Sequence, residues 1–179
     1  MDGPFYVNVL EPFVIADASS VTLSGTLQLI SPATHMPILG NNFFNYPGKA
    51  VRIRAQGRAT SAATPGNLSF GFYYGAATNN TGTSMAGVSY AWTANQANTT
   101  WVADIWVRCR VIGTSGTLVS GGFFHNQNAG GRFPINPLSL ATAASIDLTA
   151  ANYITIQASR SGSTAETMQL MDYQVEVLN

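Results

Sequence analysis

The chain has 179 residues, of which 46% are apolar, and this is enough for one domain with its own hydrophobic core. Only 9% of the residues are charged, lysine occurs once, and the formal net charge is zero. A neutral chain lacks the positive field that drives nucleic-acid binding and the basic cluster that holds proteins at membrane surfaces. Neither function is expected, and the single cysteine excludes an internal disulfide.

The first 18 residues show no regular periodicity. They place Pro4 and Pro12 among large apolar residues that include Phe5 and Tyr6. We expect an extended N-terminal arm over residues 1–18, and an additional edge strand is the open alternative. The segment lacks the basic and apolar regions of a secretory signal, and no apolar run in the chain approaches the ~18 residues that span a membrane.

Beyond the arm, apolar and polar residues alternate with a period of two, which indicates half-buried β-strands. Turn residues such as Pro65 and Gly66 separate the alternating segments. In chain order, strands are expected at residues 21–30, 49–59, 68–74, 88–93, 100–112, 117–125, 145–148, 153–160 and 167–177, with long loops at 76–87 and 126–137. The pattern predicts an all-β protein: a single jelly-roll β-sandwich domain of about eight antiparallel strands over residues 19–179.

Few side chains are suited to catalysis or metal binding. His35 and His125 lie far apart and outside any metal-binding motif. Cys109 is in register with core residues of its strand, and Ser115 lacks the strand–turn–helix context of a hydrolase nucleophile. We therefore expect no enzymatic activity, no catalytic residue, no metal and no cofactor.

Arginine side chains concentrate on the outward face of two expected strands, and carboxylates occupy the same face of the last strand. One interpretation is a solvated sheet with cross-strand ion pairs, each worth about 0–1 kcal/mol. The alternative is an interface with another subunit or with a larger assembly, because interfaces are enriched in arginine and aromatic residues and depleted in lysine. Nucleic-acid contact is a third, disfavoured interpretation. The candidate interface residues are Arg52, Arg54, Arg58, Trp106, Arg108, Arg110, Asp172, Glu176, Phe5 and Tyr6.

Aromatic residues are frequent between residues 70 and 92. Those that share the core parity of the strand at 68–74 are expected to be buried. Tyr73, Tyr90 and Trp92 are the candidate exposed aromatics, and such rings could form a platform that stacks on sugars.

Several segments match motifs that recur together in one protein family. Residues 48–58 (GKAVRIRAQGR) are similar to a G-x-x-x-R-I-R-A-x-G-R strand, and residues 64–75 (TPGNLSFGFYYG) to a T-P-x-L-x-x-G-x-Y-Y-G strand and turn. Residues 114–117 and 175–179 add further matches, so the resemblance covers about residues 35–179 in the same order. In these motifs the chain resembles a family of small tailed-phage virion structural proteins, which comprises head-decoration, minor capsid and minor tail proteins with a jelly-roll domain.

This resemblance implies a non-enzymatic component of a phage particle, made in the host cytoplasm. We expect a capsid decoration (cement) protein that binds the major capsid protein on the outer surface of the assembled head. It is expected to act as a homo-oligomer, with a trimer favoured by analogy with other decoration proteins, and to have neither nucleic acid nor a membrane as partner. The alternative is a tail-associated receptor- or carbohydrate-binding jelly-roll module.

Overall fold

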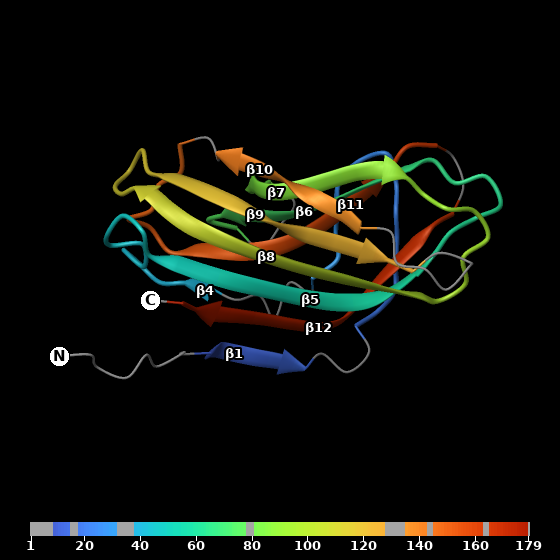
Figure 1. Ribbon diagram of the computed structural model, residues 1–179, viewed down its shortest axis with the longest axis horizontal. Helices are drawn as coiled ribbons and strands as arrows, with labels where there is room; N and C mark the ends of the chain where they lie inside the picture. The colour runs from blue at the N-terminus through green and yellow to red at the C-terminus, as the bar shows by residue number, and fades with distance from the viewer. Residues whose placement is uncertain are drawn as a thin grey trace.

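The computed structural model describes residues 9–14, 18–31, 38–77, 81–127, 135–142, 145–162 and 165–178, with the backbone alone for 9–14 and 135–142. Across these residues the chain forms strands and loops, and no helix. Two antiparallel sheets pack against each other (Figure 1), and their inward side chains form one hydrophobic core. The expected all-β sandwich is confirmed.

The chain crosses repeatedly from one sheet to the other. Sheet A contains, in spatial order, β1 (Val9–Val14), β12 (Thr167–Val177), β5 (Ala50–Thr60), β8 (Thr99–Val111), β9 (Thr117–Asn126) and β10 (Ile135–Thr142), with β2 (Val21–Thr22) also paired to β12. Sheet B contains β3 (Gln28–Leu29), β11 (Asn152–Arg160), β6 (Asn67–Gly75) and β7 (Thr83–Ala91), with β4 (Ile38–Leu39) also paired to β11. Thus β5 pairs with β12, β6 with β11 and β8 with β9, while β7 lies alongside β10. These nested pairs are what a long hairpin gives when it is rolled into two layers, as in a jelly roll.

The prediction of about eight strands was too low, because the described residues contain twelve. Three of these, β2, β3 and β4, are only two residues long. The expected strand at 21–30 is in fact two short strands, because the Ser24 hydroxyl accepts a hydrogen bond from the Thr26 N–H at 3.3 Å and the chain turns there. The segment thereby leaves sheet A and joins sheet B.

Two expected loops are partly wrong. Strand β7 begins at Thr83, inside the loop predicted at 76–87. Strand β10 was missed, because Pro137 lies within it and proline cannot donate to a central ladder. In the structure, β10 lies at the end of sheet A, where β9 is its one partner strand among the described residues.

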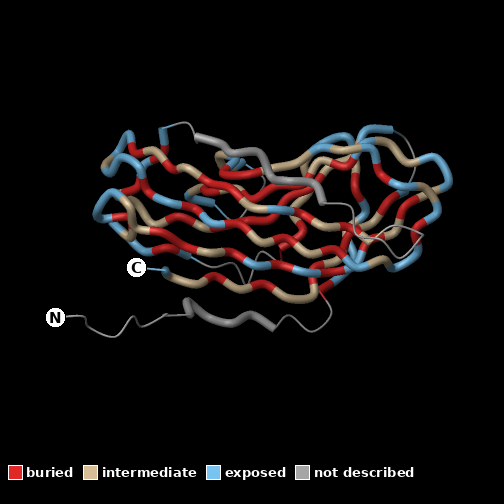
Figure 2. Tube along the Cα trace, in the orientation of Figure 1, coloured by how far each residue is buried: buried red, intermediate tan, exposed pale blue. Residues whose placement is uncertain are grey.

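The centre of the core is aromatic. Buried and outward positions alternate along β5 and β8 (Figure 2), and Trp101 of β8 meets Phe70 and Phe124, with ring centroids 5.3 and 6.0 Å away. Gly57 of β5 lies opposite Trp101. A Cβ at this glycine would be 2.7 Å from the indole ring and 1.9 Å from the Gln169 carbonyl oxygen. Strand β5 can therefore run beside the indole only because this position has no side chain.

The expected N-terminal arm is described only in part. Residues 9–14 form β1, which pairs with β12 at the edge of sheet A, with Val9 opposite Glu176 and Val14 opposite Asp172. This is the edge-strand alternative for those residues. Phe5 and Tyr6, together with the rest of 1–8 and residues 15–17, lie outside the described residues.

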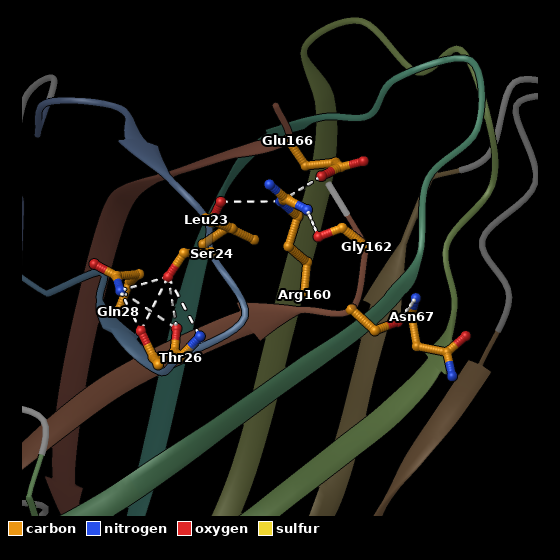
Figure 3. A network of polar contacts seen from close by, with 9 residues as sticks. Leu23, Ser24, Thr26, Gln28, Asn67, Arg160, Gly162 and Glu166 are labelled. Atoms are coloured by element: carbon orange, nitrogen blue, oxygen red, sulfur yellow. Dashed lines mark hydrogen bonds and ion pairs between the residues drawn. The ribbon is translucent and has the colours of Figure 1, made fainter. Parts of the chain in front are cut away.

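A buried ion pair holds the connection between β11 and β12 (Figure 3). Arg160 Nε lies 2.7 Å from Glu166 Oε2 and donates a hydrogen bond to the Leu23 carbonyl at 3.0 Å, and Arg160 Nη1 donates to the Gly162 carbonyl. The Glu166 carboxylate is 0% exposed and the Arg160 side chain 10% exposed. A buried charge must be paired in this way, so the two side chains fix the path of the chain between the sheets.

Candidate functional site

The outer face of sheet A gathers most of the arginines of this protein. Five of the seven arginines lie on its central strands β5 and β8, on the face turned away from the core. Antiparallel pairing brings them beside residues that are distant in sequence: Arg52 lies opposite Trp106 on one side and Glu176 on the other, and Arg54 lies opposite Asp104. We call this surface, formed by the outward side chains of β12, β5, β8 and β9, the outer face.

An ion-pair network occupies the middle of the outer face. Arg52 holds the Asp104 carboxylate with two hydrogen bonds, one from Nε to Oδ1 at 2.8 Å and one from Nη2 to Oδ2. Arg54 Nε lies 3.4 Å from Asp104 Oδ2, and Arg54 Nη1 lies 3.8 Å from Glu176 Oε1. The hydrogen bonds that Arg52 donates to Asp104 stabilise the charged guanidinium and raise the pKa of Arg52. The cross-strand pairing predicted for this face is therefore present, with Asp104 as its central carboxylate.

Asp172 takes less part in this network than the sequence suggested. A register shift between Leu170 and Asp172 marks a β-bulge in β12. Asp172 then lies opposite Gln56, whose Nε2 donates to Asp172 Oδ2 at 3.3 Å. In the part of the chain that the structure describes, no arginine forms an ion pair with Asp172.

Next to the ion pairs, the outer face is hollowed into a groove of about 760 Å³. Trp106 is 41% exposed there, and Phe123 and Leu178 are also exposed. The groove is lined by Ala50, Arg52, Asp104, Trp106, Arg108, Val119, Gly122, Phe123 and Leu178. We call it the Trp106 groove. Its lining combines exposed apolar side chains with the charged groups of Arg52, Asp104 and Arg108.

Two predicted arginines lie on the outer face but away from this groove. Arg58 lies opposite Thr100 of β8 and Gln169 of β12. Along β5 it is the third outward position beyond Arg52, and Arg52 is the residue that lies opposite Trp106. Arg110 lies beyond Arg108, where a register shift disturbs the pairing of β8 with β9. Both side chains are exposed.

The expected aromatic platform is not formed, and Trp92 was wrong as an exposed residue. Trp92 is 5% exposed, and its indole N–H donates to Gln96 Oε1 at 2.9 Å. Tyr90 packs against the core, its hydroxyl accepts a hydrogen bond from Asn126 at 3.0 Å, and burial raises its pKa. Tyr73 is half-buried, and burial raises its pKa as well. The side chain of Gln96 provides the buried partner that a tryptophan near a strand end needs, and sequence periodicity gave no sign of it.

Phe123 and Leu178 are site residues that the sequence analysis missed. Phe123 faces outward because Phe124 next to it faces the core, and register places it opposite Asp104. Strand alternation could have assigned an outward position to Phe123. Leu178 reaches the same groove because β12 pairs with β5. The pattern of a single sequence does not reveal this pairing.

The described residues show little that could support catalysis. Among them, no group of three or more histidine, cysteine, aspartate or glutamate side chains could hold a metal ion. Burial raises the pKa of the Cys109 thiol, which makes the nucleophilic thiolate rarer. No helix in this part of the chain is long and apolar enough to cross a membrane.

No family model and no curated protein matches the sequence. Among solved structures, the CBM2 module of the evolved Dit of Lactobacillus casei BL23 phage J-1 has 8% identity and a TM-score of 0.36, covering 80% of this chain and 69% of that chain. The Lotus tetragonolobus seed lectin has 9% identity and a TM-score of 0.36, over 100% and 95%. Peanut lectin has 10% identity and a TM-score of 0.32, over 99% and 93%. At these identities and TM-scores the likenesses support no conclusion about the function of this chain.

Proposed function

We propose that the chain is a non-enzymatic structural protein of a tailed-phage particle, and that it decorates the capsid by docking the outer face of sheet A onto the major capsid protein. The observation that carries this proposal is the Trp106 groove, where an exposed tryptophan lies beside Phe123, Leu178 and arginines. Tryptophan and arginine are the residues that most often dominate the binding energy of protein interfaces. The near absence of lysine and the sequence resemblance to virion proteins agree with this function.

Decoration would stabilise the particle by mass action. A protein that binds only the assembled shell lowers the free energy of that state by RT ln(1 + [L]/Kd) per site, or about 2.7 kcal/mol at a concentration of 100 Kd. Many identical sites on a capsid multiply this effect. We place the protein on the particle surface, as a homo-oligomer with a trimer favoured, and sedimentation equilibrium of the purified chain tests that state.

The test is reconstitution on capsids that lack this protein. Purified wild-type chain should bind in co-sedimentation and raise the temperature at which the capsids rupture. Trp106→Ala should weaken this binding about 30-fold, because truncation of a central interface tryptophan typically removes 2 kcal/mol or more. Ile38→Ala is the matched control, since Ile38 of β4 is 48% exposed but belongs to sheet B.

Two results would contradict the proposal. One is that the chain associates with purified tails and not with capsids. The other is that Trp106→Ala binds capsids as tightly as Ile38→Ala and wild type.

A second candidate function is a tail-associated receptor- or carbohydrate-binding module. The same groove supports it, because an exposed indole ring lies beside the Arg52–Asp104 pair, and sugars bind where an aromatic ring is flanked by hydrogen-bonding groups. Glycan-array binding that is lost in Trp106→Ala, together with retention on tails, would favour this function over capsid decoration.

A further inference from the structure

Arg108 differs from the other arginines of the outer face that lie near Trp106. Arg52 and Arg54 already contact the carboxylates of Asp104 and Glu176. Arg108 lies between β5 and β9, where its partners in register are Ala50 and Val119. Neither neighbour can accept a hydrogen bond through its side chain, and no described carboxylate lies within ion-pair distance of Arg108.

The surroundings of Arg108 make it important that no described carboxylate lies within ion-pair distance. Its exposed side chain borders a groove whose other walls include Trp106, Phe123 and Leu178. A partner that covers these apolar groups removes water from Arg108 at the same time. A guanidinium that loses its water is stable only if the partner supplies an acceptor, and a carboxylate is the best match because it can accept two parallel hydrogen bonds.

We propose that the Trp106 groove binds a protein segment that places an apolar side chain against Trp106 and a carboxylate on Arg108. The partner is thus an acidic, apolar segment, and under the proposed function it belongs to the capsid protein. This inference rests on that function and specifies the chemistry of its binding partner.

The charges of the groove disfavour other partners. Arg52 and Arg108 at its border would repel a basic segment. A neutral sugar could stack on Trp106, but it would leave Arg108 without a charged acceptor. Asp104 already pairs with Arg52, which leaves Arg108 as the arginine of the described lining for a partner anion, and one cation is too few for the repeated phosphates of a nucleic acid.

The experiment is a selection from a random 12-residue peptide library on the immobilised full-length chain, followed by titration of the enriched peptides. The selected peptides should combine at least one aspartate or glutamate with a large apolar residue. Arg108→Gln should weaken their binding about tenfold, as expected for loss of a charge-assisted hydrogen-bond pair. Arg110→Gln is the matched control, because it removes the same charge from the same strand outside the groove, and it should change the affinity less than about twofold.

The outcomes separate this inference from the proposed function. Peptides without acidic residues, or equal binding by the Arg108→Gln and Arg110→Gln variants, would overturn the carboxylate partner. If one of these results is obtained and Trp106→Ala still loses capsid binding, the docking face stands and only the proposed chemistry of the partner is wrong. Binding of neutral glycans at the groove with no peptide enrichment would overturn both. A fall in peptide affinity with rising salt for wild type but not for Arg108→Gln would further support the ion pair.

Discussion

Arginine–carboxylate pairs occur in two contrasting regions of this molecule. At the connection between β11 and β12, Arg160 and Glu166 form one buried pair, and Arg160 also binds two backbone carbonyls (Figure 3). On the outer face of sheet A, Arg52, Arg54 and Asp104 form an open network beside a groove. The chemical groups are the same, and their solvent exposure differs.

Burial, rather than the presence of a salt bridge, decides what each pair does in this molecule. The buried pair cannot be broken without leaving a charge in the core, so it constrains the fold. On the outer face the arginines stay partly exposed, 36% for Arg52 and 45% for Arg54, so water can solvate the guanidinium when such a pair breaks, and the pair contributes little to stability. The pair with Asp104 orients Arg52 in the lining of the Trp106 groove, where the proposed partner would contact it.

The largest effect on stability is expected for Glu166→Gln. The change leaves Arg160 buried without its carboxylate, and we expect the free energy of unfolding to fall by about 3–5 kcal/mol, measured by urea denaturation. The double variant Arg160→Met/Glu166→Leu removes both charges and should be more stable than the single variant. A loss below about 1 kcal/mol for Glu166→Gln would show that the pair behaves like a surface pair.

A second prediction tests how closely β5, which carries Arg52 and Arg54, packs against the core. Gly57→Ala should destabilise the protein by about 1–3 kcal/mol, because the added methyl group meets the Gln169 carbonyl and the Trp101 indole. Gly40→Ala is the control, since a Cβ at Gly40 meets no atom within 4 Å and should leave the urea midpoint unchanged. Equal midpoints for the two variants would contradict close packing of β5 against Trp101.

Much of this arrangement could be predicted from sequence, because strand alternation is a local property. The alternation along β5 and β8 assigned Arg52, Arg54 and Arg108 to the outward face together with Trp106, and the structure places them there. The all-β class follows from the same period of two. These assignments needed no knowledge of which strands are neighbours.

The rest depends on pairing between distant segments. Asp104 became the central carboxylate because β8 pairs with β5 in the register that sets Asp104 opposite Arg54. The bulge in β12 moved Asp172 opposite Gln56. Trp92 was placed wrongly because the residue that buries its polar N–H, Gln96, lies in a turn where no periodicity exists. Register, bulges and buried turn contacts are tertiary features that a single sequence does not encode locally.

A third prediction is the matched counterpart of the first. Glu176→Gln removes a carboxylate from the outer face, where Arg54 Nη1 lies 3.8 Å from Glu176 Oε1. We expect the free energy of unfolding to fall by about 0–1 kcal/mol, because the Arg54 side chain remains hydrated when its partner is lost. Urea denaturation under the conditions used for Glu166→Gln gives the direct comparison. A loss as large as that of Glu166→Gln would contradict the division between buried and open pairs.

The smallest effect on stability is expected at Asp147, whose carboxylate is held by hydrogen bonds from a nearby residue instead of by an arginine. Asp147 Oδ1 accepts hydrogen bonds from the Thr149 hydroxyl at 2.5 Å and the Thr149 N–H at 2.9 Å, and these bonds lower the pKa of Asp147 below its ordinary value of 3.8. A lowered pKa in the folded state means that the ionised carboxylate stabilises the fold above the unfolded pKa and that this contribution is lost as the pH falls through the folded value. Asp147→Asn should therefore lower the Tm slightly near neutral pH, and the difference from wild type should disappear in strong acid. A difference that persists in acid would show that the effect of the substitution does not come from the charge of Asp147.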